Sequence, residues 1–143
     1  MKCIDSHMHL WDLKVGTYPW LEKPEEREIP FGDLKNLAHD YLLPEDHQDT
    51  ATVELAGLVH VEAAWDPTNP VGESKWLAET LANFETPFAI IAGGNLLKED
   101  FPELYGPVIN NFGIKTWAFV QSQLRKSKNR TSMQQLTSTI VQY

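Results

Sequence analysis

Apolar residues occur in short continuous runs along the chain, and these runs predict β-strands. Residues 3–7 form a short β-compatible segment that predicts a first strand. Residues 55–63 are apolar at nearly every position, which is typical of a parallel strand covered on both faces. Residues 88–92 predict a third strand, and residues 113–119 predict a fourth. The chain therefore has the strand content of a small parallel sheet.

Between these runs, apolar residues recur at the spacing of helix faces. Asn69 and Pro70 have the composition of a helix cap and a first helical turn, and the apolar residues that follow them indicate one buried helix face. Residues 101–112 predict a further helix, which Gly106 and Pro107 should kink or split. The spacing thus predicts two helices that follow strands.

Residues 10–50 form a long connection that is interrupted repeatedly by proline and glycine. A short helix is expected over residues 33–43, and Pro44 should end it. Connections of this length are uncommon unless they form a lid or a pocket wall. Its aromatic residues are candidates for walling a substrate site, although aromatic residues in a long loop serve equally well to pack that loop down. The candidates are Trp11, Tyr18 and Trp20.

The order of strand, loop, strand, helix, strand, helix and strand is typical of α/β folds with parallel sheets. A complete (β/α)8 TIM barrel needs roughly 250 residues, so 143 residues can hold only part of one. We therefore expect a partial (β/α)8 barrel with its first three to four β/α units in residues 1–121. A small open α/β sheet is the structural alternative.

The charge distribution separates a C-terminal tail from this barrel portion. The formal net charge is -8, from 12 basic and 20 acidic residues, yet residues 122–143 carry four basic residues and no acid. This tail is polar and is predicted to be solvated or poorly ordered. The acidic balance argues against nucleic acid as a partner. The sequence shows no membrane span or secretory leader, and its single Cys3 excludes an internal disulfide, so we expect a cytoplasmic location.

Two histidines separated by one residue stand at the end of the first predicted strand. Side chains alternate along a strand, so His7 and His9 should project to one side while Met8 projects to the other. Neutral imidazoles that converge in this way suit zinc and similar divalent ions. The end of a strand is also where (β/α)8 barrels carry their chemistry. With five histidines in the chain such spacing can also arise by chance, so a metal site and a chance pairing both remain open.

Several ordered blocks of residues resemble the amidohydrolase-related family, also described as TIM-barrel metal-dependent hydrolases. The resemblance extends over residues 3–97. Lactonases that act on sugar acids and on intermediates of aromatic degradation are similar proteins. The blocks are IDSHMHLWD at residues 4–12, YPWL at 18–21, LLPED at 42–46, VHVEA at 59–63 and WDP at 65–67.

The resemblance implies a hydrolase that adds water to the carbonyl of a small-molecule lactone or amide. It implies that His7 and His9 are the first-strand ligands of a divalent metal ion, with zinc favoured. In this family later strands supply two more histidines and an aspartate, whereas this chain has no histidine after His60. Some similar lactonases keep the histidine pair without needing a metal, so the ion is also expected to be dispensable or absent in part of the family.

His60 and Glu62 lie two residues apart near the end of the second predicted strand. Their spacing places both on one strand face, where they could line the substrate pocket. The alternative is a buried histidine paired with a carboxylate. Because later-strand ligands are missing, a rival to the hydrolase is a catalytically silent truncated fragment or interaction module. A partial barrel leaves sheet edges unpaired, so self-association through those edges is expected.

Overall fold

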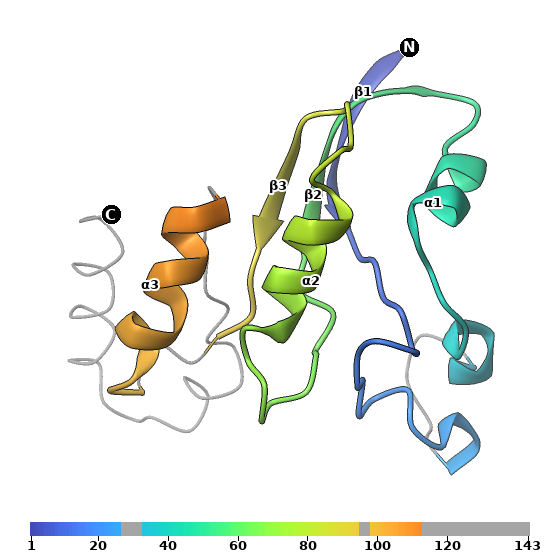
Figure 1. The fold of residues 1–143 in the computed structure, drawn as a ribbon. Coiled ribbons are helices and arrows are strands. Elements are labelled where there is room, and N and C mark those ends of the chain that lie inside the picture. Colours follow the sequence, from blue (N-terminus) through green and yellow to red (C-terminus); the bar gives the residue numbers. More distant parts are fainter. Residues whose placement is uncertain (27–32, 95–97, 113–143) are drawn as a thin grey trace, which may run out of the picture.

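The computed structural model describes residues 1–26, 33–94 and 98–112, with side chains to Val108 in the last of these segments. Within these residues the chain forms a mixed α/β fold around one parallel sheet of three strands (Figure 1). The strands are β1 (Lys2–Met8), β2 (Glu54–Val61) and β3 (Phe88–Ile91), and they lie in the order β1-β2-β3. The first three strands expected from the sequence are therefore confirmed.

The strand register brings His9, His60 and Glu62 to the carboxyl end of the sheet. Met8 of β1 lies opposite His60 of β2, and Val61 of β2 lies opposite Ile91 of β3. Because all strands are parallel, the residues that follow them emerge at the same edge. His9 and Glu62 are such residues, so two segments that are far apart in sequence meet there.

The helices lie beside the sheet, with α2 and α3 near β2 and β3 and α1 beyond β1 (Figure 1). The α-helices are α1 (Leu43–Asp49), α2 (Gly72–Thr80) and α3 (Phe101–Phe112), and two 3-10 helices span Pro24–Glu26 and Leu34–Leu37. The fourth expected strand, at residues 113–119, and the tail at 122–143 lie outside the described residues.

The short helix expected over residues 33–43 is wrong in its extent. The Asp33 side chain accepts the backbone N–H of Lys35 at 2.9 Å and caps one 3-10 turn only. A separate helix, α1, then begins at Leu43, one residue before Pro44. Proline is tolerated in the first turn of a helix because that turn lacks intrahelical N–H partners. Pro44 therefore starts a helix instead of ending one.

Helix α2 begins later than the Asn69-Pro70 pair predicts. The Asp66 side chain accepts the backbone N–H of Thr68 at 2.7 Å, and the backbone N–H of Gly72 donates to the Asn69 carbonyl at 3.0 Å. A side-chain cap at Asn69 would accept the N–H of a residue two or three positions later, and the N–H of Gly72 already donates to the Asn69 carbonyl. The first helical residue is consequently Gly72.

Helix α3 runs through Gly106 and Pro107 as one element, so the expected split is wrong. The residues on either side of that pair, Tyr105 and Val108, are each only 2% exposed. Burying two such side chains stabilises the helix by a few kcal/mol, which is about the cost of an internal proline. Packing of the apolar face thus outweighs the missing N–H.

The main core lies between the sheet and the helices α2 and α3. It combines residues at the ends of the strands with apolar positions of both helices. Leu10, Leu77 and Leu81 are fully buried in it. The remaining buried members are Met8, Leu58, Val71, Ile90, Ala92, Tyr105 and Val108.

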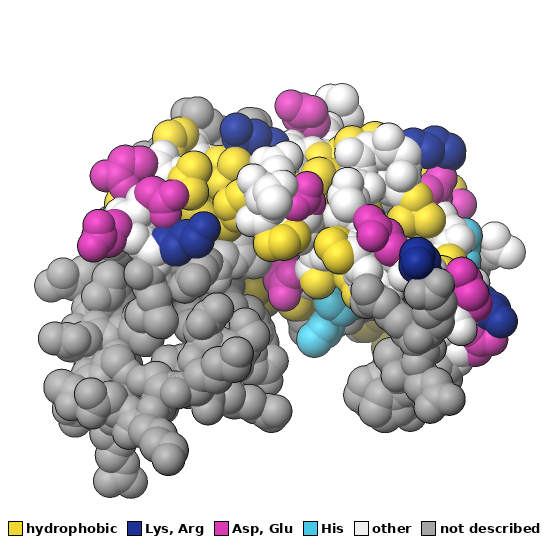
Figure 2. Space-filling view, turned by 90° about the horizontal axis from the view of Figure 1, so that it is seen from below, with side chains coloured by type: hydrophobic (Ala, Val, Ile, Leu, Met, Phe, Trp, Pro, Cys, Tyr) yellow, Lys and Arg dark blue, Asp and Glu magenta, His cyan; other side chains and the backbone are white. Residues whose placement is uncertain are grey.

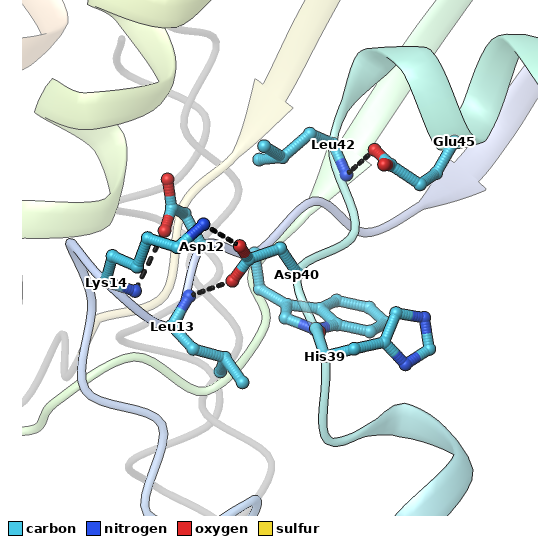
Figure 3. A network of polar contacts seen from close by, with 8 residues as sticks. Asp12, Leu13, Lys14, His39, Asp40, Leu42 and Glu45 are labelled. Atoms are coloured by element: carbon cyan, nitrogen blue, oxygen red, sulfur yellow. Dashed lines mark hydrogen bonds and ion pairs between the residues drawn. The ribbon is translucent and has the colours of Figure 1, made fainter.

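A second, aromatic cluster packs the loop that follows β1. Trp11 stacks on Tyr41 with ring centroids 5.3 Å apart, and the backbones of these two residues form a two-bond antiparallel bridge. Asp40 accepts the backbone N–H of Leu13 at 3.0 Å and the Lys14 ammonium at 2.6 Å (Figure 3). The loop is therefore held against the segment that precedes α1.

Among the described residues, no helix combines the length and the apolar character that crossing a bilayer requires.

Gly16 should tolerate no side chain, because the aromatic cluster fills the space around it. A Cβ at this position would lie 2.7 Å from Cε2 of Tyr18 and 2.8 Å from Cε3 of Trp65. We expect Gly16→Ala to lower the free energy of unfolding by about 1–3 kcal/mol through this overpacking. Denaturant unfolding followed by tryptophan fluorescence measures the change.

Gly106→Ala is the matched control, since a Cβ there meets no atom of the described residues within 4 Å. The position lies inside α3, where alanine is favoured over glycine by about 1 kcal/mol. This variant should therefore unfold at a higher denaturant concentration than the parent. Equal stability of the two variants would contradict the packing assigned to Gly16.

Candidate functional site

The His7 and His9 rings lie next to each other at the carboxyl end of β1. Their centroids are 5.0 Å apart, and the planes cross at 70°. His7 is exposed and His9 is half-buried, whereas Met8 between them is 6% exposed and belongs to the main core. The expected alternation along the strand is thus confirmed. Figure 2 looks onto this edge of the molecule, where histidine side chains reach the surface beside hydrophobic ones.

A hydrogen bond to β2 orients the His9 ring. Its Nδ1 lies 2.8 Å from the carbonyl oxygen of Val61. A carbonyl oxygen can only accept, so Nδ1 carries the proton, and in the neutral ring Nε2 keeps its lone pair. Histidines that bind metals almost always have such a partner on their other nitrogen. The arrangement is therefore the one that a metal-binding or proton-accepting imidazole requires.

His60 is fully buried beside this pair. Its ring centroid lies 6.3 Å from that of His9, and its Nε2 donates to the Leu10 carbonyl at 3.3 Å. Burial lowers the pKa of His60 to about 4, so the ring is neutral at pH 7. Its Nδ1 has no hydrogen-bond partner among the described residues. His60 thus supports the loop after β1 and leaves one buried acceptor unused.

Glu62 lies between the ends of β2 and β3. Its Oε2 accepts the backbone N–H of Ala64 at 2.7 Å, and a Cβ added to Gly93 would lie 3.1 Å from the same oxygen. Glu62 is half-buried, and His60, two residues earlier, forms its hydrogen bond with the Leu10 carbonyl. The two side chains therefore do not form the buried histidine–carboxylate pair that was the alternative expectation.

The three aromatic candidates differ in exposure. Trp11 and Tyr18 are buried, at 7% and 2% exposed, and both belong to the aromatic cluster. Trp20 is half-buried, and its indole N–H donates to the Ala63 carbonyl at 2.7 Å. The structure thus brings Trp20 to the end of β2, while Trp11 and Tyr18 serve mainly to pack the loop.

Glu73 is a buried carboxyl group that the sequence analysis missed. It is 3% exposed, and its Oε1 accepts the backbone N–H of Ala63 at 2.8 Å. Burial raises the pKa of Glu73 to about 8. The signal was available, because Glu73 precedes the buried Leu77 by four residues and so lies on the apolar face of α2.

The histidine pair could provide two ligands for a divalent cation. Among residues 1–26, 33–94 and 98–112, no group of three or more His, Cys, Asp or Glu side chains is arranged to hold a metal ion. His39 and His47 are exposed residues outside the pair.

Comparison with known proteins finds one informative relative. No protein-family profile matches the chain, and no solved structure matches it. A Sinorhizobium fredii protein named "Uncharacterized protein y4mH" is 36% identical over 101 residues, which are 71% of this chain and 34% of that protein. The chain thus spans about a third of the length of this relative.

Acidification should destabilise the fold through His60. Its folded pKa of about 4 lies below the ordinary histidine value of 6.5, so the unfolded chain takes up a proton between these pH values and the folded chain does not. The stabilisation is complete above pH 6.5 and is lost as the pH falls to about 4. At about 1.4 kcal/mol per pKa unit, we expect a loss of roughly 3 kcal/mol.

Denaturant unfolding at several pH values measures this effect, with His60→Gln as the variant that lacks the titrating group. The parent should lose stability relative to this variant between pH 6.5 and 5, because the parent alone carries the buried histidine, whereas the carboxyl groups, Glu73 included, titrate equally in both proteins. His39→Gln, at an exposed position, is the control and should follow the parent. A parent-like slope in His60→Gln would assign the acid sensitivity to other groups.

Proposed function

We propose that this chain is the N-terminal part of a hydrolase of the amidohydrolase-related family. In this proposal the chain carries the first β/α units of a (β/α)8 barrel. The reaction adds water to the carbonyl of a lactone or amide at the carboxyl ends of the strands. The resemblance of residues 4–12 and 59–67 to that family motivates the proposal, together with the geometry of the histidine pair.

The fold and the relative support the barrel. Strands β1, β2 and β3 are parallel and are neighbours in chain order, as consecutive strands of such a barrel are. The 101 matched residues are 34% of the Sinorhizobium fredii protein, so that protein has roughly 101/0.34, or about 300, residues. A barrel of this class needs about 250 residues. The relative is therefore long enough for a complete barrel that includes units like these.

The orientation of His9 is the observation that carries the proposal. Its Nδ1–H donates to the Val61 carbonyl, which leaves Nε2 free as a ligand or a base next to the His7 ring. Holding an imidazole in one tautomer beside a second imidazole has a clear chemical use at the end of a barrel strand. A chance pair of histidines would need no such support from another strand.

His7 and His9 would hold a divalent cation, zinc by preference for nitrogen ligands. When bound, such an ion polarises a carbonyl and lowers the pKa of a coordinated water. The residues around the pair have separate tasks. Trp20 would contact the body of the substrate, and the half-buried Glu62 would accept a hydrogen bond from it.

Removing either histidine should weaken divalent-ion binding and lactone hydrolysis together. We expect His7→Ala and His9→Ala each to raise the Kd for zinc at least tenfold, a loss of about 1.4 kcal/mol. Equilibrium dialysis measures zinc binding, and a chromogenic lactone series measures hydrolysis. His39→Ala is the matched control, because His39 is exposed and lies outside the pair, and the substitution keeps the backbone carbonyl that accepts the Trp11 indole N–H.

Unchanged zinc affinity and unchanged hydrolysis in both variants would refute the proposed site. Hydrolysis that depends on the pair without any zinc binding would instead assign the two imidazoles to proton transfer or substrate binding. In that case the family assignment would stand, and the metal would be discarded.

The exposed first strand favours a second candidate function, that of an interaction module without catalysis. Within the described residues β1 pairs with β2 alone, and its Ile4 side chain is 65% exposed. An apolar edge of this kind invites pairing with another strand. A self-associating chain should sediment as an oligomer at micromolar concentration.

Ile4→Lys should shift such an oligomer toward monomer, since a charged edge residue opposes strand pairing. Sedimentation velocity at several protein concentrations gives the result. Lys35→Glu, at an exposed position of the 3-10 helix, is the charge-change control. A concentration-independent monomer in the parent would remove this candidate.

A further inference from the structure

Glu73 lies at one end of a short relay of hydrogen bonds that passes through the Ala63 backbone to Trp20. Its Oε1 accepts the backbone N–H of Ala63 at 2.8 Å. The carbonyl of the same residue, Ala63, accepts the indole N–H of Trp20 at 2.7 Å. One backbone residue thus connects a carboxyl group on α2 to an aromatic side chain in the loop after β1.

The relay forms where β2 leaves the sheet. The last ladder bond of this segment runs from the Glu62 N–H to the Ile91 carbonyl at 2.9 Å. Leu58 and Glu62 direct their N–H groups toward β3, so the N–H of Ala63 points to the opposite side of the strand, toward β1. The pairing of β1 with β2 ends at Met8 and His60, and Ala64 then adopts a φ of 55°, in the left-handed region. The buried N–H of Ala63 therefore has no partner in the described strands, and leaving it unpaired would cost about 1–3 kcal/mol. The Glu73 carboxyl supplies the missing acceptor.

We propose that Glu73 is a positioning residue whose carboxyl orients the Ala63 backbone and thereby holds the Trp20 indole at the histidine end of the sheet. The catalytic part of this inference rests on the proposed function. The geometric part does not. Val61, only two residues before Ala63, accepts the bond from His9, so a shift of this segment would disturb both Trp20 and His9.

The surroundings of Glu73 keep its carboxyl neutral near pH 7. Burial raises its pKa to about 8, and the nearby charge of Glu62 acts in the same direction. Among the described residues, the titratable groups that face it from other elements are Glu62 after β2, Tyr18 in the loop and Tyr105 on α3. Because its pKa is raised to about 8 by burial, Glu73 behaves as a neutral hydrogen-bonding partner.

Two substitutions of Glu73 separate hydrogen bonding from simple packing. Glu73→Gln keeps an oxygen acceptor of the same size, whereas Glu73→Met keeps the volume and removes the acceptor. Glu79→Met, on the exposed side of the same helix, is the matched control. Heteronuclear NMR of each protein reports the exchange rate of the Ala63 amide and the position of the Trp20 indole N–H signal.

We expect Glu73→Met to raise the exchange rate of the Ala63 amide at least tenfold and to move the Trp20 indole signal. Glu73→Gln and Glu79→Met should resemble the parent at pH 7. The parent's indole signal should also shift as the pH rises through about 8, because Glu73 ionises there, and Glu73→Gln should lack this step. This pH step keeps the inference testable if Glu73→Met does not fold.

Parent-like Ala63 exchange in a folded Glu73→Met, or an identical pH step in Glu73→Gln, would overturn the positioning role. Lactone hydrolysis gives the separate catalytic readout. Glu73→Met should lower kcat more than tenfold, with Glu73→Gln restoring it. A parent that hydrolyses no lactone would refute the proposed function, while the NMR result would still decide whether Glu73 positions Trp20.

Discussion

The constraint on which the rest of this structure depends is the need to satisfy the backbone where β2 leaves the sheet. Strand β2 ends at Val61, so the backbone N–H and C=O groups of residues 62–64 no longer belong to the strand. Val61 and Ala63 are nevertheless buried, and their backbone groups need hydrogen-bond partners within the protein. Three of these groups find partners from other parts of the chain: the Val61 carbonyl accepts from His9, the Ala63 N–H donates to Glu73, and the Ala63 carbonyl accepts from Trp20. The N–H of Ala64 donates to Glu62 within the segment itself.

This shared segment links the order of the long loop to the candidate chemistry. The loop after β1 is packed by its own aromatic cluster, with Trp11 bonded to the His39 carbonyl and bridged to Tyr41. Trp20 connects the same loop to the end of β2. The aromatic residues therefore act first as structural contacts, and any role in contacting substrate follows from the position that these contacts impose.

The electrostatics of the site favour neutral groups near pH 7. Burial lowers the pKa of His60 and so disfavours its protonated, positive form. Burial raises the pKa of Glu73 and so disfavours its ionised, negative form. The two effects oppose each other across the pH scale. His60 removes stability as the pH falls below 6.5, and Glu73 removes it as the pH rises from 4.5 through about 8.

Local pattern was sufficient to predict the three described strands, helix α3 and the shared side of His7 and His9, because strand period and apolar runs are properties of neighbouring residues. It misassigned the helix around Pro44, because a proline can either end a helix or begin one, and the capping contacts select between these outcomes. The role of Glu73 could not be read from its own neighbourhood. Its partner is an amide ten residues away in sequence, and only the packing of α2 against the end of β2 brings the two together.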